Sequence, residues 1–132
     1  MNKTLTLLTT LTLSVAAAHT AVSGVTPAPA ATVRAPAAVT LTFSEPVELR
    51  FSTFRVMAVP AGVSVPEAAR RALAEPADSA RLASRPGVVT GAAVRLTLPL
   101  KASLKAGPFV VAWKILSEDG HPVTGHSTFR VR

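Results

Sequence analysis

The sequence predicts an all-β fold, an antiparallel sandwich with one helical insertion. Several short stretches alternate apolar and polar residues with the period of two that half-buried strands show. The longer stretch 109–116 is apolar on both faces apart from Lys114, which favours a central strand. Turn-forming residues separate these stretches, for example Gly107-Pro108. Many short strands joined by turns are typical of a sandwich.

The strands are expected in the order in which their apolar faces occur along the chain. They fall at 39–43, 54–58, 94–98, 109–116 and 128–131. Before them, 26–36 is rich in Ala and Pro, which predicts an extended segment with turns. The first strand is expected to end in a turn at Ser44-Glu45-Pro46. We expect Trp113 and three phenylalanines in the core, namely Phe43, Phe109 and Phe129.

The helical insertion is expected within 60–87, between two strands. Residues from Glu67 to Glu75 are Ala, Leu, Glu and Arg, all of which rank high in helix propensity. Pro66 is compatible with a first helical turn, and Pro76 is expected to stop the helix. We therefore expect a short helix or a partly ordered loop in this region.

The first 18 residues have the features of a secretory signal peptide. Lys3 supplies the positive charge, 5–15 is apolar, and Ala16-Ala17-Ala18 offers small residues for cleavage. Cleavage after Ala18 would leave a mature domain of residues 19–132, located outside the cytoplasm. A later cut near Ala31 is the alternative, because Ala-rich sequence continues there. The apolar run is too short for a good membrane span, and we expect none in the mature chain.

The composition limits the chemistry that this chain can perform. It has no cysteine, so any metal site must use nitrogen and oxygen ligands. The net charge of +7 is compatible with nucleic-acid binding. However, the arginines are scattered, Arg70-Arg71 is the only adjacent pair, and aromatic residues are few. We therefore expect no nucleic-acid partner.

The chain contains three histidines, and two of them have neighbours that suggest a metal site. After cleavage, His19 would offer its α-amine and its imidazole to one ion. Asp119 and His121 are two residues apart and point to the same side of an extended segment. Together these groups form a set of three nitrogens and one oxygen that suits Cu(II), with Zn(II) as the competitor. The spacing alone is weak evidence, because Asp-Gly-His also occurs in ordinary turns. We expect His126 to face solvent on the last strand, opposite Phe129.

Three blocks of sequence resemble the CopC family of periplasmic copper-resistance proteins. They are 19–27 (HTAVSGVTP), 41–47 (LTFSEPV) and 113–125 (WKILSEDGHPVTG), the last leading into 128–131. The resemblance implies an immunoglobulin-like, cupredoxin-like Greek-key sandwich or barrel, for which we expect about seven strands. It covers nearly the whole mature chain except about 60–87.

The resemblance also implies a function and a site. One Cu(II) ion per chain would be held by the mature N-terminal His19 together with Asp119 and His121. The expected role is copper resistance and homeostasis outside the cytoplasm, by buffering or delivery, in a monomer that is not an enzyme. A membrane copper transporter is the partner that the family suggests. Some members carry a methionine-rich Cu(I) site, which we expect to be missing because Met57 is the only methionine of the mature part.

Two other functions remain open from the sequence. An N-terminal histidine with a second histidine also forms the copper brace of lytic polysaccharide monooxygenases. This chain has no tyrosine to serve as an axial residue and little sequence for a flat substrate face. The other alternative is a metal-free immunoglobulin-like adhesion or assembly module, which would need only the strands.

Overall fold

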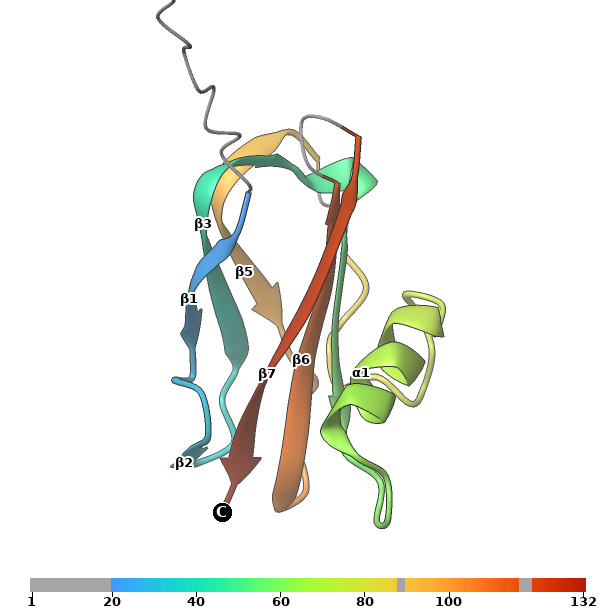
Figure 1. Ribbon diagram of the computed structural model, residues 1–132. Helices are drawn as coiled ribbons and strands as arrows, with labels where there is room; N and C mark the ends of the chain where they lie inside the picture. Colours follow the sequence, from blue (N-terminus) through green and yellow to red (C-terminus); the bar gives the residue numbers. More distant parts are fainter. Residues whose placement is uncertain (1–19, 88–89, 117–119) are drawn as a thin grey trace, which may run out of the picture.

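Two β-sheets packed face to face form the body of the protein in the computed structural model, which describes residues 20–87, 90–116 and 120–132 (Figure 1). The first sheet has the order β1-β3-β5 and the second the order β2-β7-β6-β4. Their bounds are β1 (Val22–Thr26), β2 (Ala31–Val33), β3 (Ala38–Glu48), β4 (Thr53–Ala58), β5 (Ala92–Pro99), β6 (Gly107–Leu116) and β7 (Pro122–Val131). These seven strands in the described part of the chain confirm the predicted all-β sandwich. The pairing is antiparallel as predicted except between β2 and β7, which are parallel.

The main core lies between the two sheets and consists of the apolar side chains that alternate along the strands. Val39 and Leu41 of β3 are fully buried, and the three phenylalanines expected in the core are at most 4% exposed. The rings of Phe109 and Phe129, which are opposite each other on β6 and β7, stack with centroids 5.3 Å apart. Aromatic stacking of this kind adds to the stabilisation from buried area. The predicted core is therefore confirmed at these positions.

A second core lies on the outer face of the second sheet, under the helix α1 (Val65–Ala74) (Figure 1). The Ser64 side chain accepts a hydrogen bond from the Glu67 backbone N–H and so caps the helix. The helix buries a face of small residues, which allows its backbone to approach the sheet closely. The cluster comprises Ala68, Ala69, Ala72, Met57, Leu82, Val110 and Ala112. The predicted helix is confirmed, but the prediction that 54–58 is only half-buried is wrong, because α1 covers Met57.

β3 continues through the segment that we expected to be a turn. Its pairing with β5 is irregular between Thr42 and Val47, and its last pair with β1 joins Phe43 to Val22. Pro46, which has no N–H to donate, therefore lies where no regular ladder bond is required. The expected end of the strand at Ser44-Glu45-Pro46 is wrong, and β3 runs on to Glu48 before the 3-10 helix η1 (Leu49–Phe51).

β6 lies between β4 and β7, which confirms the predicted central strand. Its two faces contribute to the two cores, so both are apolar. Trp113 of β6 is half-buried and lies against Gly125 of β7, where an added Cβ would come 2.6 Å from the indole ring. β7 begins at Pro122, earlier than the predicted 128. No helix among the described residues is long and apolar enough to cross a bilayer.

Candidate metal centre

One end of the sandwich brings together two segments that are far apart in the sequence. β6 stops and β7 begins at this end, with Leu116 opposite Pro122, and the described chain starts there at Thr20 (Figure 1). His121 is exposed and directly precedes β7. Gly120 has φ of 82°, a left-handed conformation that favours glycine. We call the region of Thr20, Ala21 and Gly120–Pro122 the histidine end.

The start of the described chain is fixed by hydrogen bonds to β3. The Ala21 N–H donates to Ser44 Oγ over 2.9 Å, and the Ser44 N–H donates to the Ala21 carbonyl over 2.9 Å. Thr20 is only 3% exposed, and its hydroxyl donates to Glu45 Oε2 over 3.4 Å. These contacts fix Thr20 and Ala21 against β3. Ser44 and Glu45, which the sequence suggested as turn residues, are therefore anchors of the N-terminal segment.

The structure places one of the three expected copper ligands. His121 lies at the histidine end, whereas His19 and Asp119 lie outside the described residues. The residue that follows His19 is nevertheless held at this end, and so is the residue that follows Asp119. Within 20–87, 90–116 and 120–132, no group of three His, Cys, Asp or Glu side chains could hold a metal ion. The joint site of His19, Asp119 and His121 thus stays a prediction.

His126 belongs to another part of the molecule. It lies opposite Ala112 in the middle of the second sheet and is exposed on the face of β7 away from Phe129. His121 and His126 are five positions apart, which corresponds to about 17 Å along an extended strand. The prediction of a solvent-facing strand histidine is confirmed.

The donor chemistry of the described residues fits nitrogen and oxygen coordination rather than sulfur. Met57 is 5% exposed beneath α1 and belongs to the second core. The chain has no cysteine. A soft Cu(I) ion prefers sulfur ligands, whereas imidazole, amine and carboxylate suit Cu(II). His121 contributes an exposed imidazole to the histidine end.

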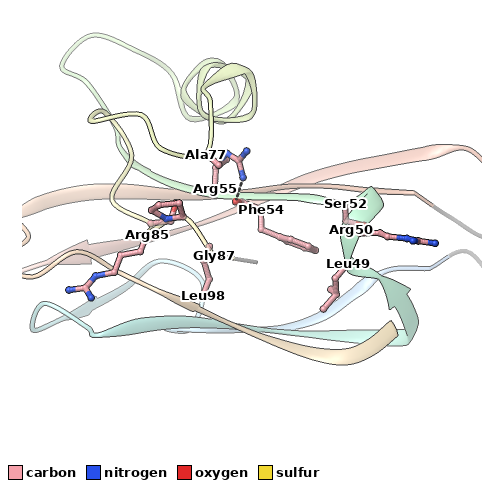
Figure 2. A pocket seen from close by; sticks show the side chains of 11 residues that line it. Leu49, Arg50, Ser52, Phe54, Arg55, Ala77, Arg85, Gly87 and Leu98 are labelled. Atoms are coloured by element: carbon pink, nitrogen blue, oxygen red, sulfur yellow. Dashed lines mark hydrogen bonds between the residues drawn. The ribbon is translucent and has the colours of Figure 1, made fainter. Parts of the chain in front are cut away.

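A cavity of about 220 Å³ lies on another side of the sandwich, between β4 and β5, and does not have the features of an anion site. Figure 2 shows that Arg50 and Arg85 extend away from each other, toward opposite ends of this cavity. Arg55 donates to the carbonyls of Glu75 and Phe54, over 3.4 Å and 2.9 Å. Partial burial lowers the pKa of Arg55. The cations at this cavity thus do not converge on one point.

The two packed sheets and the exposed histidine before β7 are those of a small β-sandwich protein, and comparison with known proteins identifies the family. The model of the CopC domain matches residues 22–132, so this chain belongs to the CopC family. The fold resemblance that the sequence indicated is therefore confirmed.

Two proteins of known name and one solved structure are similar to this chain. The chain is 32% identical over 124 residues to copper resistance protein C of Pseudomonas syringae pv. tomato, covering 92% of this chain and 87% of that protein. It is 47% identical to protein YobA of Escherichia coli K12 over 38 residues, which are 29% of this chain and only 31% of YobA. The crystal structure of PcoC, a copper resistance protein from Escherichia coli, is similar with a TM-score of 0.59 and 26% identity, covering 85% of this chain and 99% of PcoC.

Proposed function

We propose that this protein binds one Cu(II) ion outside the cytoplasm and serves copper resistance and homeostasis. The observation that carries the proposal is the histidine end, where His121 and the anchored Thr20 lie at the same end of the sandwich. Membership of the CopC family and the names of the relatives support copper as the metal. The role would be to buffer copper or to deliver it, with a membrane copper transporter as the proposed recipient.

The proposed ligands are His19, Asp119 and His121. His19 would supply two donors, its α-amine and its imidazole, once cleavage after Ala18 has freed the amine. In the uncleaved chain the same nitrogen is an amide, which is a poor donor. Cleavage during export would therefore switch on copper binding outside the cytoplasm. Pro122 restricts His121 to extended conformations, which favours convergence of its imidazole with the Asp119 carboxylate.

We propose a binding protein rather than an enzyme. A carboxylate ligand from Asp119 would occupy coordination space that oxygen activation needs. The copper-loaded protein should therefore produce no more hydrogen peroxide with ascorbate than an equal amount of copper held by a tight chelator. Faster peroxide production would favour the copper-brace oxidase instead.

The direct test compares two chains that differ by one residue. Residues 19–132 and residues 18–132 are titrated with Cu(II) against a competing chelator. The extra Ala18 blocks the α-amine of His19 and leaves both imidazoles and the carboxylate in place. We expect the affinity of the longer chain to be lower by more than about 100-fold, since even groups that only orient metal ligands contribute 10- to 100-fold. Equal affinities would rule out ligation by the terminal amine.

A further inference from the structure

The charges of this protein are distributed unevenly along the sandwich. The five acidic residues among those described lie near the histidine end or around α1, at Glu45, Glu48, Glu67, Glu75 and Asp78. The opposite end, where the chain terminates in Figure 1, has exposed basic residues instead. We call four of them, Arg34, Lys105, Arg130 and Arg132, the basic end.

Strand pairing holds these four residues together. The N–H of Arg132 donates to the carbonyl of Val33, the residue before Arg34, over 3.0 Å. Arg130 pairs with Thr32 of β2, and the two strands are parallel. Arg130, Arg132 and Arg34 therefore lie at the same end of the second sheet. Lys105 lies two residues before Gly107, which pairs with Val131. All four side chains are exposed, and none forms an ion pair with another described residue.

The surroundings of the basic end contain further positive charge and little negative charge. The loop that contacts Pro108 through the Val59 N–H has no charged residue from 59 to 64. Arg85 and Lys101 line a neighbouring hollow of about 370 Å³ next to Ala35. The Lys101 ammonium donates to the Ser79 carbonyl over 3.3 Å, which places Asp78 nearby.

We propose that the basic end binds the anionic phospholipid headgroups of a membrane surface. Its four cations come from separate segments of the chain and do not converge on one point. A site for one small anion would need them to converge. Such a layer of charge matches a surface on which many phosphates lie side by side. Each Lys or Arg close to an anionic leaflet contributes about 1 kcal/mol, or about fivefold in binding. Together the four would contribute about 4 kcal/mol, which corresponds to weak, reversible attachment.

The test measures binding of the protein to vesicles of phosphatidylcholine, with and without about one third of phosphatidylglycerol, by sedimentation at about 0.15 M salt. The basic-end variant is R34Q/K105Q/R130Q/R132Q. The control variant R70Q/R71Q/R95Q/K114Q removes the same number of exposed charges elsewhere. Circular dichroism of both variants verifies that they are folded. We expect about 600-fold weaker binding for the basic-end variant, the product of four fivefold contributions, and less than about 10-fold weakening for the control.

Three outcomes would overturn the proposal. Equal weakening of both variants would show that net charge alone drives the binding. Equal binding to vesicles without phosphatidylglycerol would show that headgroup charge is not recognised. Absence of vesicle binding by the unmodified protein, combined with retention on immobilised polyglutamate that the basic-end variant loses, would assign this end to an acidic protein. The inference does not depend on the proposed copper site, because the experiment uses metal-free protein.

Discussion

The two ends of the sandwich differ in what they expose. The histidine end has a buried anchor at Thr20, an adjacent carboxylate at Glu45 and an exposed imidazole at His121. The basic end has four exposed cations and no acidic residue within its own segments. β7 runs from one end to the other, since it begins after His121 and reaches Val131, so the two ends are separated by about 30 Å of extended strand. The difference suggests that metal binding and surface attachment are independent.

The largest effect should come from the histidine end. Replacement His121→Ala removes one proposed ligand and should lower the Cu(II) affinity by more than about 100-fold, which exceeds the usual effect of groups that only orient ligands. His126→Ala is the matched control, because His126 is also exposed but lies in the middle of the sheet. Competition titration with a chelator measures both. A similar loss in the two variants would contradict the assignment of His121.

Substitution of Gly125, which lies between the two ends, should destabilise the fold as a whole. Gly125→Ala places a Cβ 2.6 Å from the Trp113 ring, so the indole must move. We expect a loss of about 1–3 kcal/mol in the free energy of unfolding, as for other overpacked sites. Denaturant titration followed by the fluorescence of this single tryptophan measures it. Gly24→Ala, whose Cβ would meet Thr42 at an ordinary 3.7 Å, is the control and should be milder.

A smaller effect on copper should follow from loosening the anchor. Thr20→Val keeps the shape of the buried side chain but removes the hydroxyl that donates to Glu45. We expect a Cu(II) affinity about 2- to 10-fold lower, the range that one hydrogen bond contributes. Ser23→Ala removes a comparable hydroxyl, which donates to the Thr42 carbonyl further along β1. If Ser23→Ala weakened copper binding as much, the contact of Thr20 with Glu45 would have no special role.

The smallest effect should lie outside both ends, on α1. A hydrogen bond from Arg71, with the charges of Arg70 and Arg71, lowers the pKa of Glu67. A carboxyl group whose pKa is lower in the folded state stabilises the fold above its unfolded pKa, and this contribution disappears as the pH falls through the folded pKa. Glu67→Gln should therefore slightly lower the melting temperature at neutral pH but not in acid. A difference that grew on acidification would contradict this sign.

Local patterns predicted much of the fold. The two-faced apolar stretch 109–116 predicted the central strand β6, and propensity predicted α1. Propensity could not show that α1 packs on the sheet, which is why the burial of Met57 was missed. Pro46 suggested a turn because local rules do not anticipate a bulge in β3. Val94 is 53% exposed although it continues the apolar face of Leu96 and Leu98, because it lies within the same irregular pairing.

Local sequence patterns predicted the candidate site less completely than the fold. The spacing of Asp119 and His121 indicated a pair of ligands, but the role of Ser44 and Glu45 depends on contacts across more than 20 residues. Such contacts follow from the tertiary fold and have no local signature. The participation of His19 and Asp119 stays a prediction, since both lie outside the described residues.

Native mass spectrometry of the exported, copper-loaded protein tests the central claim most directly. The mass of the polypeptide identifies its first residue, and the additional mass counts the metal ions bound. We predict a chain that begins at His19 and holds one copper ion. A chain that begins at another residue, for example after Ala31, and still holds one copper ion would contradict the proposed site.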